Sequence, residues 1–437
     1  MKKRVLIFTL AAIITASAEN KDTRTRPLND AVNGADVTLF GSDAMGVAKK
    51  TNEGSTGGGK VTKVASLPIT TSIAKVTRPL AIQNFKEVGG KRYFRKKYIK
   101  KLADRVHRFQ NNQGSSFKNQ HWVRGTYYAG LMAIYESTAD TAYLNDCMEW
   151  GEKVAWKIKK QRGGPYESGA YPLICGQIWY GCYQSKKDEQ MIQPTLAFLE
   201  DPKVENPLSE PGKWYLENSG HHFVDGLFTA PPALAMLYQM TGDEKYVNWM
   251  NACFWDIHSE IYDTDEDLFY RDKNSKPEVR RSKNGKKILW SRGNGWAFGG
   301  LTRILKYLPS EHPSYPKYKA LYMKMAESLA KRQQADGFWR SNLDDPEHHT
   351  MKESSGTGFF CYGITWGINN GILDRERFLP VAKNAWKALS SVVSKEGIVG
   401  WNQPPGGGPA SVRSTDTTRY GAGIFLLAAS EIYLLKQ

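Results

Sequence analysis

The sequence predicts an all-α protein whose helices form an (α/α)6 barrel, a ring of inner helices enclosed by a ring of outer helices. Three observations lead to this prediction. From about Tyr93 onward, amphipathic segments alternate with segments that are apolar on every side. The alternation occurs six times, with roughly 50–65 residues between like segments, a regularity that indicates a repeated architecture. Long and unequal stretches precede the apolar segments, as expected where loops gather at one mouth of a ring.

The two kinds of segment differ in the faces that they can bury. The amphipathic segments carry Lys, Asp and Glu on one face and are predicted to be outer helices. They span residues 93–109, 142–159, 190–199, 244–257, 315–333 and 380–393. The apolar segments, rich in Gly, Ala and aromatic residues, span residues 122–135, 176–183, 225–240, 295–308, 357–369 and 420–435. Strict alternation favours a closed double ring, whereas an open α-solenoid, the alternative, would show a more regular period.

Residues 1–18 have the features of a secretory signal peptide. Lys2, Lys3 and Arg4 form a charged start, and residues 5–14 form an apolar run that is too short to span a bilayer. The segment ends in Ala-Ser-Ala, which is typical of a cleavage site. We therefore expect an exported protein, either periplasmic or secreted.

The rest of the chain divides into two parts. Residues 19–90 are polar and contain a Gly-rich run, which is typical of a leader or linker. Residues 91–437 carry the repeats and form the predicted (α/α)6 catalytic domain. No later stretch has the roughly 18 apolar residues that a spanning helix needs, so no membrane segment is expected.

Composition narrows the class of protein further. The 437 residues are 41% hydrophobic and 12% aromatic, which supplies a large core and excludes a disordered chain. The formal net charge of +16 suits an anionic partner such as an acidic glycan, while the expected export argues against nucleic acid. Five cysteines without a CxxC pair exclude a disulfide scaffold and a zinc ribbon; most are expected to be buried, and one disulfide stays open. We expect no metal or cofactor, and a monomer or weak homodimer.

Chemistry-bearing residues gather at the predicted starts of the inner helices, where they would face the cavity of the ring. These positions hold Trp122, Arg124, Gln177, Asp225, Arg292, Trp296, Ser354, Ser355, Arg419 and Tyr420. A guanidinium binds a carboxylate through a planar fork, and aromatic faces can stack on sugar rings. The set therefore indicates a pocket for an anionic sugar. The alternative, that each Arg pairs with a structural acid, stays open.

Asp225 is the candidate catalytic residue, because no other acid stands at a clear inner-helix start. Asp416, three residues before Arg419, is the nearest rival. A lone Asp before an apolar helix is more often an N-cap, and this alternative also stays open. An ordinary glycosidase needs two carboxylates. One acid is enough for a reaction that begins and ends with a proton transfer.

Seven short strings occur in a characteristic order between residues 93 and 435. They are W-V-R-G from 122, D-G-L-F from 225, L-F-Y-R-D from 268, W-S-R-G-N-G-W from 290, D-G-F-W from 336, S-G-T-G-F-F from 355 and W-G-I-N-N-G from 366. With them the chain resembles the unsaturated rhamnogalacturonyl hydrolases of glycoside hydrolase family 105. That family is related to the unsaturated glucuronyl hydrolases of family 88.

The resemblance implies an (α/α)6 barrel and an Asp at position 225 that acts as general acid and then as general base. The implied substrate is a pectin oligosaccharide of rhamnogalacturonan type, left by a lyase, with a C4=C5 unsaturated uronate at its non-reducing end. Protonation of C4 in this vinyl ether leaves oxocarbenium character at C5, and water adds there. The hemiketal then opens and the glycosidic bond is lost. The carboxyl must start protonated, so its pKa should be raised by burial.

The residues expected to hold the sugar come from the helix starts and from the strings that carry the resemblance. They are Trp122, Arg124, His222, Trp290, Arg292, Trp296, Arg271, Trp339, Arg419 and Tyr420. Among them, the W-x-R-x-x-x-W pattern of Trp290, Arg292 and Trp296 is implied to hold the uronate.

The chain departs from the family pattern at three positions. Relatives often carry an acid a few residues ahead of the Gly-Gln pair at 176, and residues 171–175 carry none. Phe223 stands where many relatives have Trp, and Arg271 stands where some have His. The missing acid indicates a different linkage or uronate, and the additional Arg suits a more anionic substrate.

Two other functions stay open. A polysaccharide lyase on a similar toroid would need a Tyr or His base, and Tyr127, Tyr128 or His221 could supply one. A non-catalytic glycan-binding protein would keep the pocket and lack part of the catalytic machinery. Activity on pre-cleaved oligomers or on intact polymer separates the first two functions, and binding without turnover marks the third.

Overall fold

The computed structural model describes residues 90–114, 119–158, 171–200 and 223–436. The predicted signal peptide and almost all of the predicted leader lie outside these residues, as does His222. The described part contains twelve α-helices and one short antiparallel ribbon.

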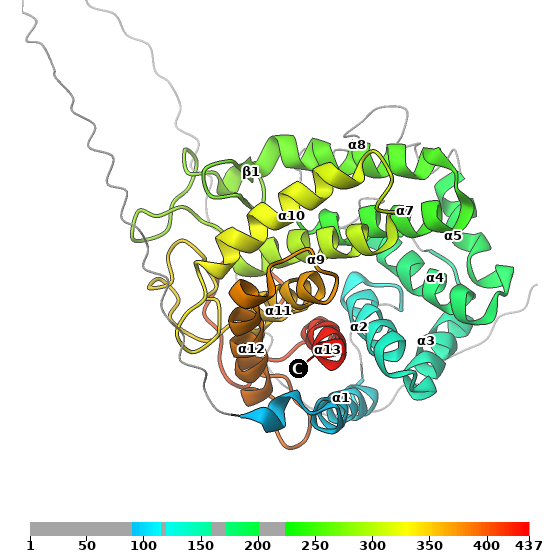
Figure 1. The fold of residues 1–437 in the computed structure, drawn as a ribbon, viewed down its shortest axis with the longest axis horizontal. Helices are drawn as coiled ribbons and strands as arrows, with labels where there is room; N and C mark the ends of the chain where they lie inside the picture. Colours follow the sequence, from blue (N-terminus) through cyan, green and yellow to red (C-terminus); the bar gives the residue numbers. More distant parts are fainter. Residues whose placement is uncertain (1–89, 115–118, 159–170, 201–222, 437) are drawn as a thin grey trace, which may run out of the picture. The chain divides into compact units, whose positions relative to one another are not determined.

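Six helices form the inner ring, as the apolar segments predicted. They are α2 (Trp122–Thr138), α4 (Ile174–Lys186), α7 (Gly226–Thr241), α9 (Ser291–Tyr307), α11 (Ser354–Asn369) and α13 (Arg419–Leu434). Each packs against the next, and α13 packs against α2, so the ring closes. Figure 1 shows α13 between α2 and α11. Closure excludes the open solenoid.

The amphipathic segments form the outer layer. They are α1 (Lys96–Asn111), α3 (Thr141–Lys153), α5 (Gln193–Glu200), α8 (Glu244–Ile261), α10 (Tyr315–Ala330) and α12 (Arg375–Ser391). In Figure 1, α1, α3, α10 and α12 lie outside the helices on which they pack. The predicted (α/α)6 barrel is therefore confirmed.

Local signals set the helix boundaries. Gly242 ends α7 with φ of 69°, and the Asp243 carboxylate accepts the Lys245 N–H at 3.0 Å to begin α8. The last outer helix starts earlier than predicted, because Asp374 caps it through the Arg377 N–H at 2.8 Å. Its proline therefore lies inside the helix and not at its start.

The prolines of α7 explain a buried polar contact at the centre of the ring. Pro232 has no N–H, so the carbonyl of Phe228, four residues earlier, loses its usual helical partner. The Gln177 side chain donates to that carbonyl at 2.7 Å and to the Thr229 carbonyl at 2.9 Å. Arg303 in turn donates to the Gln177 amide oxygen at 2.7 Å. These hydrogen bonds connect α4, α7 and α9 at the first turn of α7.

The cysteines and the hydropathy of the helices agree with the sequence. All five cysteines are buried and free, so the disulfide that the sequence left open is not formed. No helix in the described ranges is both long and apolar enough to cross a membrane.

Candidate active site

Asp225 stands directly before the first turn of α7, at the mouth where the inner helices begin. Its backbone is already helical, with φ of −57° and ψ of −33°, and its side chain makes no capping hydrogen bond. The residue is half-buried, yet its Oδ2 atom has no exposed surface and no hydrogen-bond partner among the described residues. The structure thus rejects the capping role. A buried carboxylate oxygen without a partner requires another explanation.

The surroundings of Asp225 suit an acid that must begin in the protonated form. Burial raises the pKa of the Asp225 carboxyl above its ordinary value. The positive charges of Arg271 and Arg292 oppose this effect in part, and the Asp272 carboxylate adds to it. The net shift is upward, because desolvation outweighs the two guanidiniums.

A short chain of backbone contacts holds the segment that carries Asp225. The Val224 N–H donates to the Arg271 carbonyl at 3.0 Å. Arg271 follows a ribbon of β1 (Tyr262–Asp263) and β2 (Leu268–Phe269), in the long loop before α9. The buried Asn294 side chain of α9 binds both the N–H and the carbonyl of Phe269, at 2.8 and 2.9 Å. An inner helix therefore sets the position of the segment that carries Asp225 through this ribbon.

Arg271 lies flat against the segment before Asp225. Its guanidinium carbon is 3.8 Å from the centre of the Phe223 ring, and Nη1 donates to the Asp272 carboxylate. The guanidinium also lies close to Gly407, where a Cβ atom would be 3.2 Å from the guanidinium carbon. The two replacements that distinguish this chain from the family pattern, Phe223 and Arg271, are thus stacked on one another.

Arg292 is turned toward the loop that precedes α13. Its Nη1 donates to the carbonyls of Gln403 at 3.0 Å and Pro404 at 3.2 Å and to the Tyr420 hydroxyl, and its Nη2 donates to the Gly406 carbonyl at 3.0 Å. The residue is only 1% exposed. Its observed contacts are therefore those of an anchor for residues 403–406.

Aromatic side chains from five inner helices meet at the same end of the ring. The Trp296 ring contacts those of Trp122, Phe228 and Phe359 at centroid distances of 5.9, 5.3 and 4.7 Å. Tyr420 completes the cluster, 5.2 Å from Trp122. The Trp296 indole N–H is buried and has no partner among the described residues, so it is available to a ligand.

Other predicted site residues have contacts typical of packing. The indoles of Trp290 and Trp339 are fully buried and donate to the Gln403 side chain and the Leu329 carbonyl, both at 2.8 Å. Arg419 donates to two carbonyls at the end of α1, and the Arg124 guanidinium donates to Asn119 at 3.0 Å. The open alternative, a structural acid as the partner of each Arg at a helix start, finds no support among the described residues, because carbonyls, an amide or a tyrosine hydroxyl are the partners of Arg124, Arg292 and Arg419.

Glu353 is a second acid at an inner-helix start. The expectation that Asp225 is the only acid at such a position was therefore wrong. Glu353 precedes α11 and is fully buried. The two carboxylate oxygens of Glu353 accept hydrogen bonds from the N–H groups of Ser355 and Gly356 at 2.8 and 2.7 Å. Glu353 is therefore an N-cap, whereas Asp225 is not. In the sequence, the Glu directly before Ser-Ser-Gly was the feature that could have indicated this cap. Of these two acids in the described residues, only Asp225 has a carboxylate oxygen without a hydrogen-bond partner.

Comparison with known proteins identifies the family. The sequence profile of Glycosyl Hydrolase Family 88 matches residues 98–436. The chain belongs to glycosyl hydrolase family 88. This agrees with the resemblance found in the sequence, which related the chain to families 105 and 88, and it makes the protein a glycosidase.

Individual members are similar over most of their length. An unsaturated 3S-rhamnoglycuronyl hydrolase of Alteromonas sp. (strain LOR) is 32% identical over 337 residues, which cover 74% of this chain and 80% of the relative. A family 88 structure from Bacteroides vulgatus is 29% identical, with a TM-score of 0.70 over 78% of this chain and 99% of that one. A structure named as a polysaccharide lyase is 30% identical, with a TM-score of 0.70 over 77% and 97% of the two chains.

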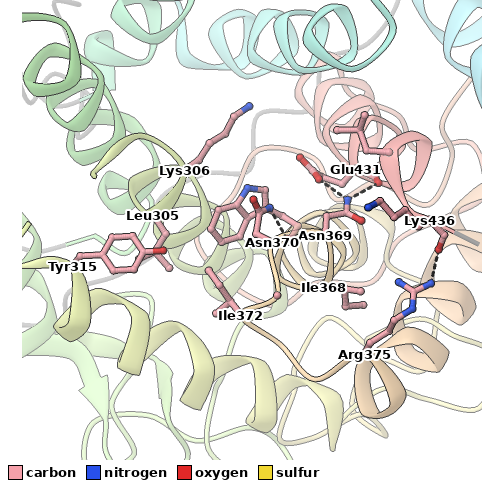
Figure 2. Close-up of a pocket in the computed structure, with 13 residues that line it drawn as sticks. Leu305, Lys306, Tyr315, Ile368, Asn369, Asn370, Ile372, Arg375, Glu431 and Lys436 are labelled. Carbon is pink, nitrogen blue, oxygen red and sulfur yellow. Dashed lines mark hydrogen bonds between the residues drawn. The ribbon is translucent and has the colours of Figure 1, made fainter. Parts of the chain in front are cut away.

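A cavity of about 710 Å³ lies at the opposite end of the barrel in this family 88 chain (Figure 2). It is lined by the last residues of α9, α11 and α13, about 25 Å along the helix axes from the mouth that carries Asp225. Three of its charged side chains, those of Lys306, Arg375 and Glu431, have protein partners. Lys306 lies 2.5 Å from Glu136, and Glu431 accepts the Asn369 amide at 2.9 Å. We assign it no part in catalysis.

The raised pKa of Asp225 predicts a pH-dependent cost to stability. The folded state holds this proton more tightly than the unfolded chain does, so ionisation destabilises the fold as pH rises above the ordinary Asp value of about 3.9. Asp225→Asn is therefore expected to raise the free energy of unfolding at neutral pH, with the gain vanishing in acid. Denaturant titrations at several pH values measure this.

Asp416→Asn serves as a control of opposite sign for the stability measurement. Burial raises the pKa of Asp416, but the hydrogen bonds from Arg413 lower this pKa by a larger amount, so the net shift is downward. This substitution should destabilise the protein at neutral pH. Equal effects of the two substitutions across the pH range would contradict the burial argument for Asp225.

Proposed function

We propose that this protein is an unsaturated uronyl hydrolase, which removes a C4=C5 unsaturated uronate from the non-reducing end of an oligosaccharide. The observation that carries the proposal is the buried Asp225 oxygen, which has no partner among the described residues at the catalytic mouth. Family membership and the hydrolase relatives support it. An isolated carboxyl with a raised pKa suits a reaction that starts by protonating carbon.

The proposed reaction uses Asp225 twice. The protonated carboxyl donates its proton to C4 of the vinyl ether, and positive charge develops at C5 and the ring oxygen. The resulting carboxylate takes a proton from the water that adds to C5, which restores the acid. The hemiketal then opens, the glycosidic bond is lost, and the uronate leaves as a keto acid. The net change is the addition of one water molecule, and no second carboxylate is required.

We infer rhamnose as the sugar next to the uronate. The relative from Alteromonas is named for a 3S-rhamnoglycuronyl substrate, and the resemblance found in the sequence implied a rhamnogalacturonan substrate. Both names combine a uronate with rhamnose. The aromatic cluster of Trp122, Trp296 and Tyr420 lies at the same mouth as Asp225, and the Trp296 indole N–H has no partner among the described residues. We also propose that the reaction takes place outside the cytoplasm, on the basis of the predicted signal peptide in residues 1–18.

A polysaccharide lyase is the second candidate, because a structure that is 30% identical carries that name. The tyrosines offered as its base are poorly suited to that role. Tyr127 is fully buried, its hydroxyl lies 3.0 Å from His107 Nδ1, and burial raises its pKa well above the ordinary value. Tyr128 is stacked on Trp150 at 4.2 Å, and burial raises its pKa to about 12. His221, the third candidate, lies outside the described residues.

A substrate panel separates these functions. It contains unsaturated uronyl–rhamnose disaccharides with and without a 3-sulfate on rhamnose, the unsaturated rhamnogalacturonan disaccharide, and the intact polymers. The ultraviolet absorbance of the conjugated double bond should fall with the disaccharides and stay constant with the polymers. A rise with intact polymer would establish a lyase. Tight binding of the disaccharides without any change in absorbance would establish a glycan-binding protein.

A further inference from the structure

Two guanidiniums lie near Asp225, and the structure uses them differently. Arg292 is 1% exposed and directs both of its terminal nitrogens to the loop of residues 403–406. The Arg271 side chain is 16% exposed and makes one side-chain hydrogen bond among the described residues, from Nη1 to Asp272. The Nε atoms of both arginines are without a partner in the same set, so the difference lies in the exposure and in the terminal nitrogens. Arg271 therefore keeps one edge of its planar fork for a ligand.

The position of Arg271 matches the one anion that every substrate of the proposed reaction carries. The carboxylate of the uronate is attached to C5, the direct neighbour of the C4 atom that Asp225 protonates. A group that binds this carboxylate must lie beside Asp225. Arg271 meets this requirement, because its carbonyl accepts the Val224 N–H at 3.0 Å and its guanidinium stacks on Phe223 at 3.8 Å. Both partners are within two residues of Asp225.

We propose that Arg271, and not Arg292, binds the carboxylate of the unsaturated uronate. This inference rests on the proposed function and deepens it. An arginine fork binds a carboxylate in two parallel hydrogen bonds, and the contacts of the guanidinium with the Phe223 ring and with Gly407 restrict its orientation. Arg292 is then a positioning residue, because the loop that it anchors continues directly into Gly407.

The test compares one disaccharide in two forms, the free acid and its methyl ester, which lacks the negative charge. Wild-type protein should prefer the acid by about 10- to 100-fold in kcat/KM, as expected for hydrogen bonds to a charged group. Arg271→Gln should bring this ratio close to one, mainly through a higher KM for the acid. Arg271→Lys should restore the preference only in part, because an ammonium keeps the charge without the fork.

Arg292→Gln is the matched variant. It should lower kcat/KM for the acid and the ester by the same factor and should lower the thermal midpoint, because it releases the loop. If Arg271→Gln keeps the preference for the acid while Arg292→Gln loses it, the inference is overturned. If wild-type protein consumes neither form, the proposed function itself fails, a result that differs from either pattern in the variants. Circular dichroism of each variant identifies any loss of fold.

Discussion

Asp225→Asn is expected to lower kcat on an unsaturated uronyl disaccharide by about 10²- to 10⁴-fold, the range for loss of a general acid. The amide has nearly the same shape as the carboxyl but cannot give a proton to C4. It also cannot take a proton from the attacking water. Oδ2 makes no hydrogen bond among the described residues, so the substitution breaks no hydrogen bond of that atom. The loss should therefore appear in kcat, with KM little changed.

The decay of double-bond absorbance measures this loss, and Asp416→Asn is the control. Asp416 was the nearest rival in the sequence, but its carboxylate is bound by the Arg413 backbone at 2.8 Å and by the Arg413 guanidinium. This variant should keep nearly full activity at a temperature well below its unfolding midpoint. Substantial turnover by Asp225→Asn, or equal losses in both variants, would show that another group transfers the proton.

The second large effect concerns the closure of the ring. Helices α2 and α13 meet through Gly130 and Gly423, and a Cβ atom at Gly130 would lie 2.2 Å from the Gly423 carbonyl oxygen. A backbone atom cannot move aside as the end of a flexible side chain can. Gly130→Val is therefore expected to force the two helices apart and to cost about 3 kcal/mol or more in the free energy of unfolding. Denaturant titration of the purified variant measures this cost.

Gly114→Ala is the matched control for ring closure. A Cβ atom at Gly114 would meet nothing within 4 Å, so this substitution should change stability by no more than about 0.5 kcal/mol. Activity adds a second readout, because α2 and α13 supply Trp122 and Tyr420 to the site. A Gly130→Val protein with unchanged stability and activity would show that the ring tolerates a wider separation than the structure indicates.

Much of the fold could be predicted because the buried face of a helix requires apolar residues at regular intervals in the sequence. Helices that are apolar on all sides must be inside, and amphipathic ones must be outside, so their alternation indicated the double ring. The long loops before the inner helices also indicated the mouth at which Asp225 lies. Glu353 was missed because the apolar segment was placed from residue 357, whereas the helix begins at Ser354, directly after Glu353.

The roles of the arginines could not be predicted in the same way. In the sequence, Arg292 lies in the string that most resembles the family, and it was expected to hold the uronate. Its partners are carbonyl oxygens 111 to 114 residues further along the chain, and backbone carbonyls are present at every position. The residue types in the sequence therefore do not indicate such a contact. Only the folded chain shows that Arg292 is occupied and that Arg271 keeps donors for a ligand.

The sequence by itself determined the alternation of inner and outer helices, the candidate acid Asp225 and the family to which the chain belongs. These features depend on local periodicity and on short strings, which can be read without knowing the fold. The tertiary structure decided that Asp225 is not a cap and that Glu353 is one. It also decided which partners the guanidiniums of Arg271 and Arg292 take. These outcomes depend on which groups meet across the ring, and hydrogen bonds between distant segments form only when the ring has closed.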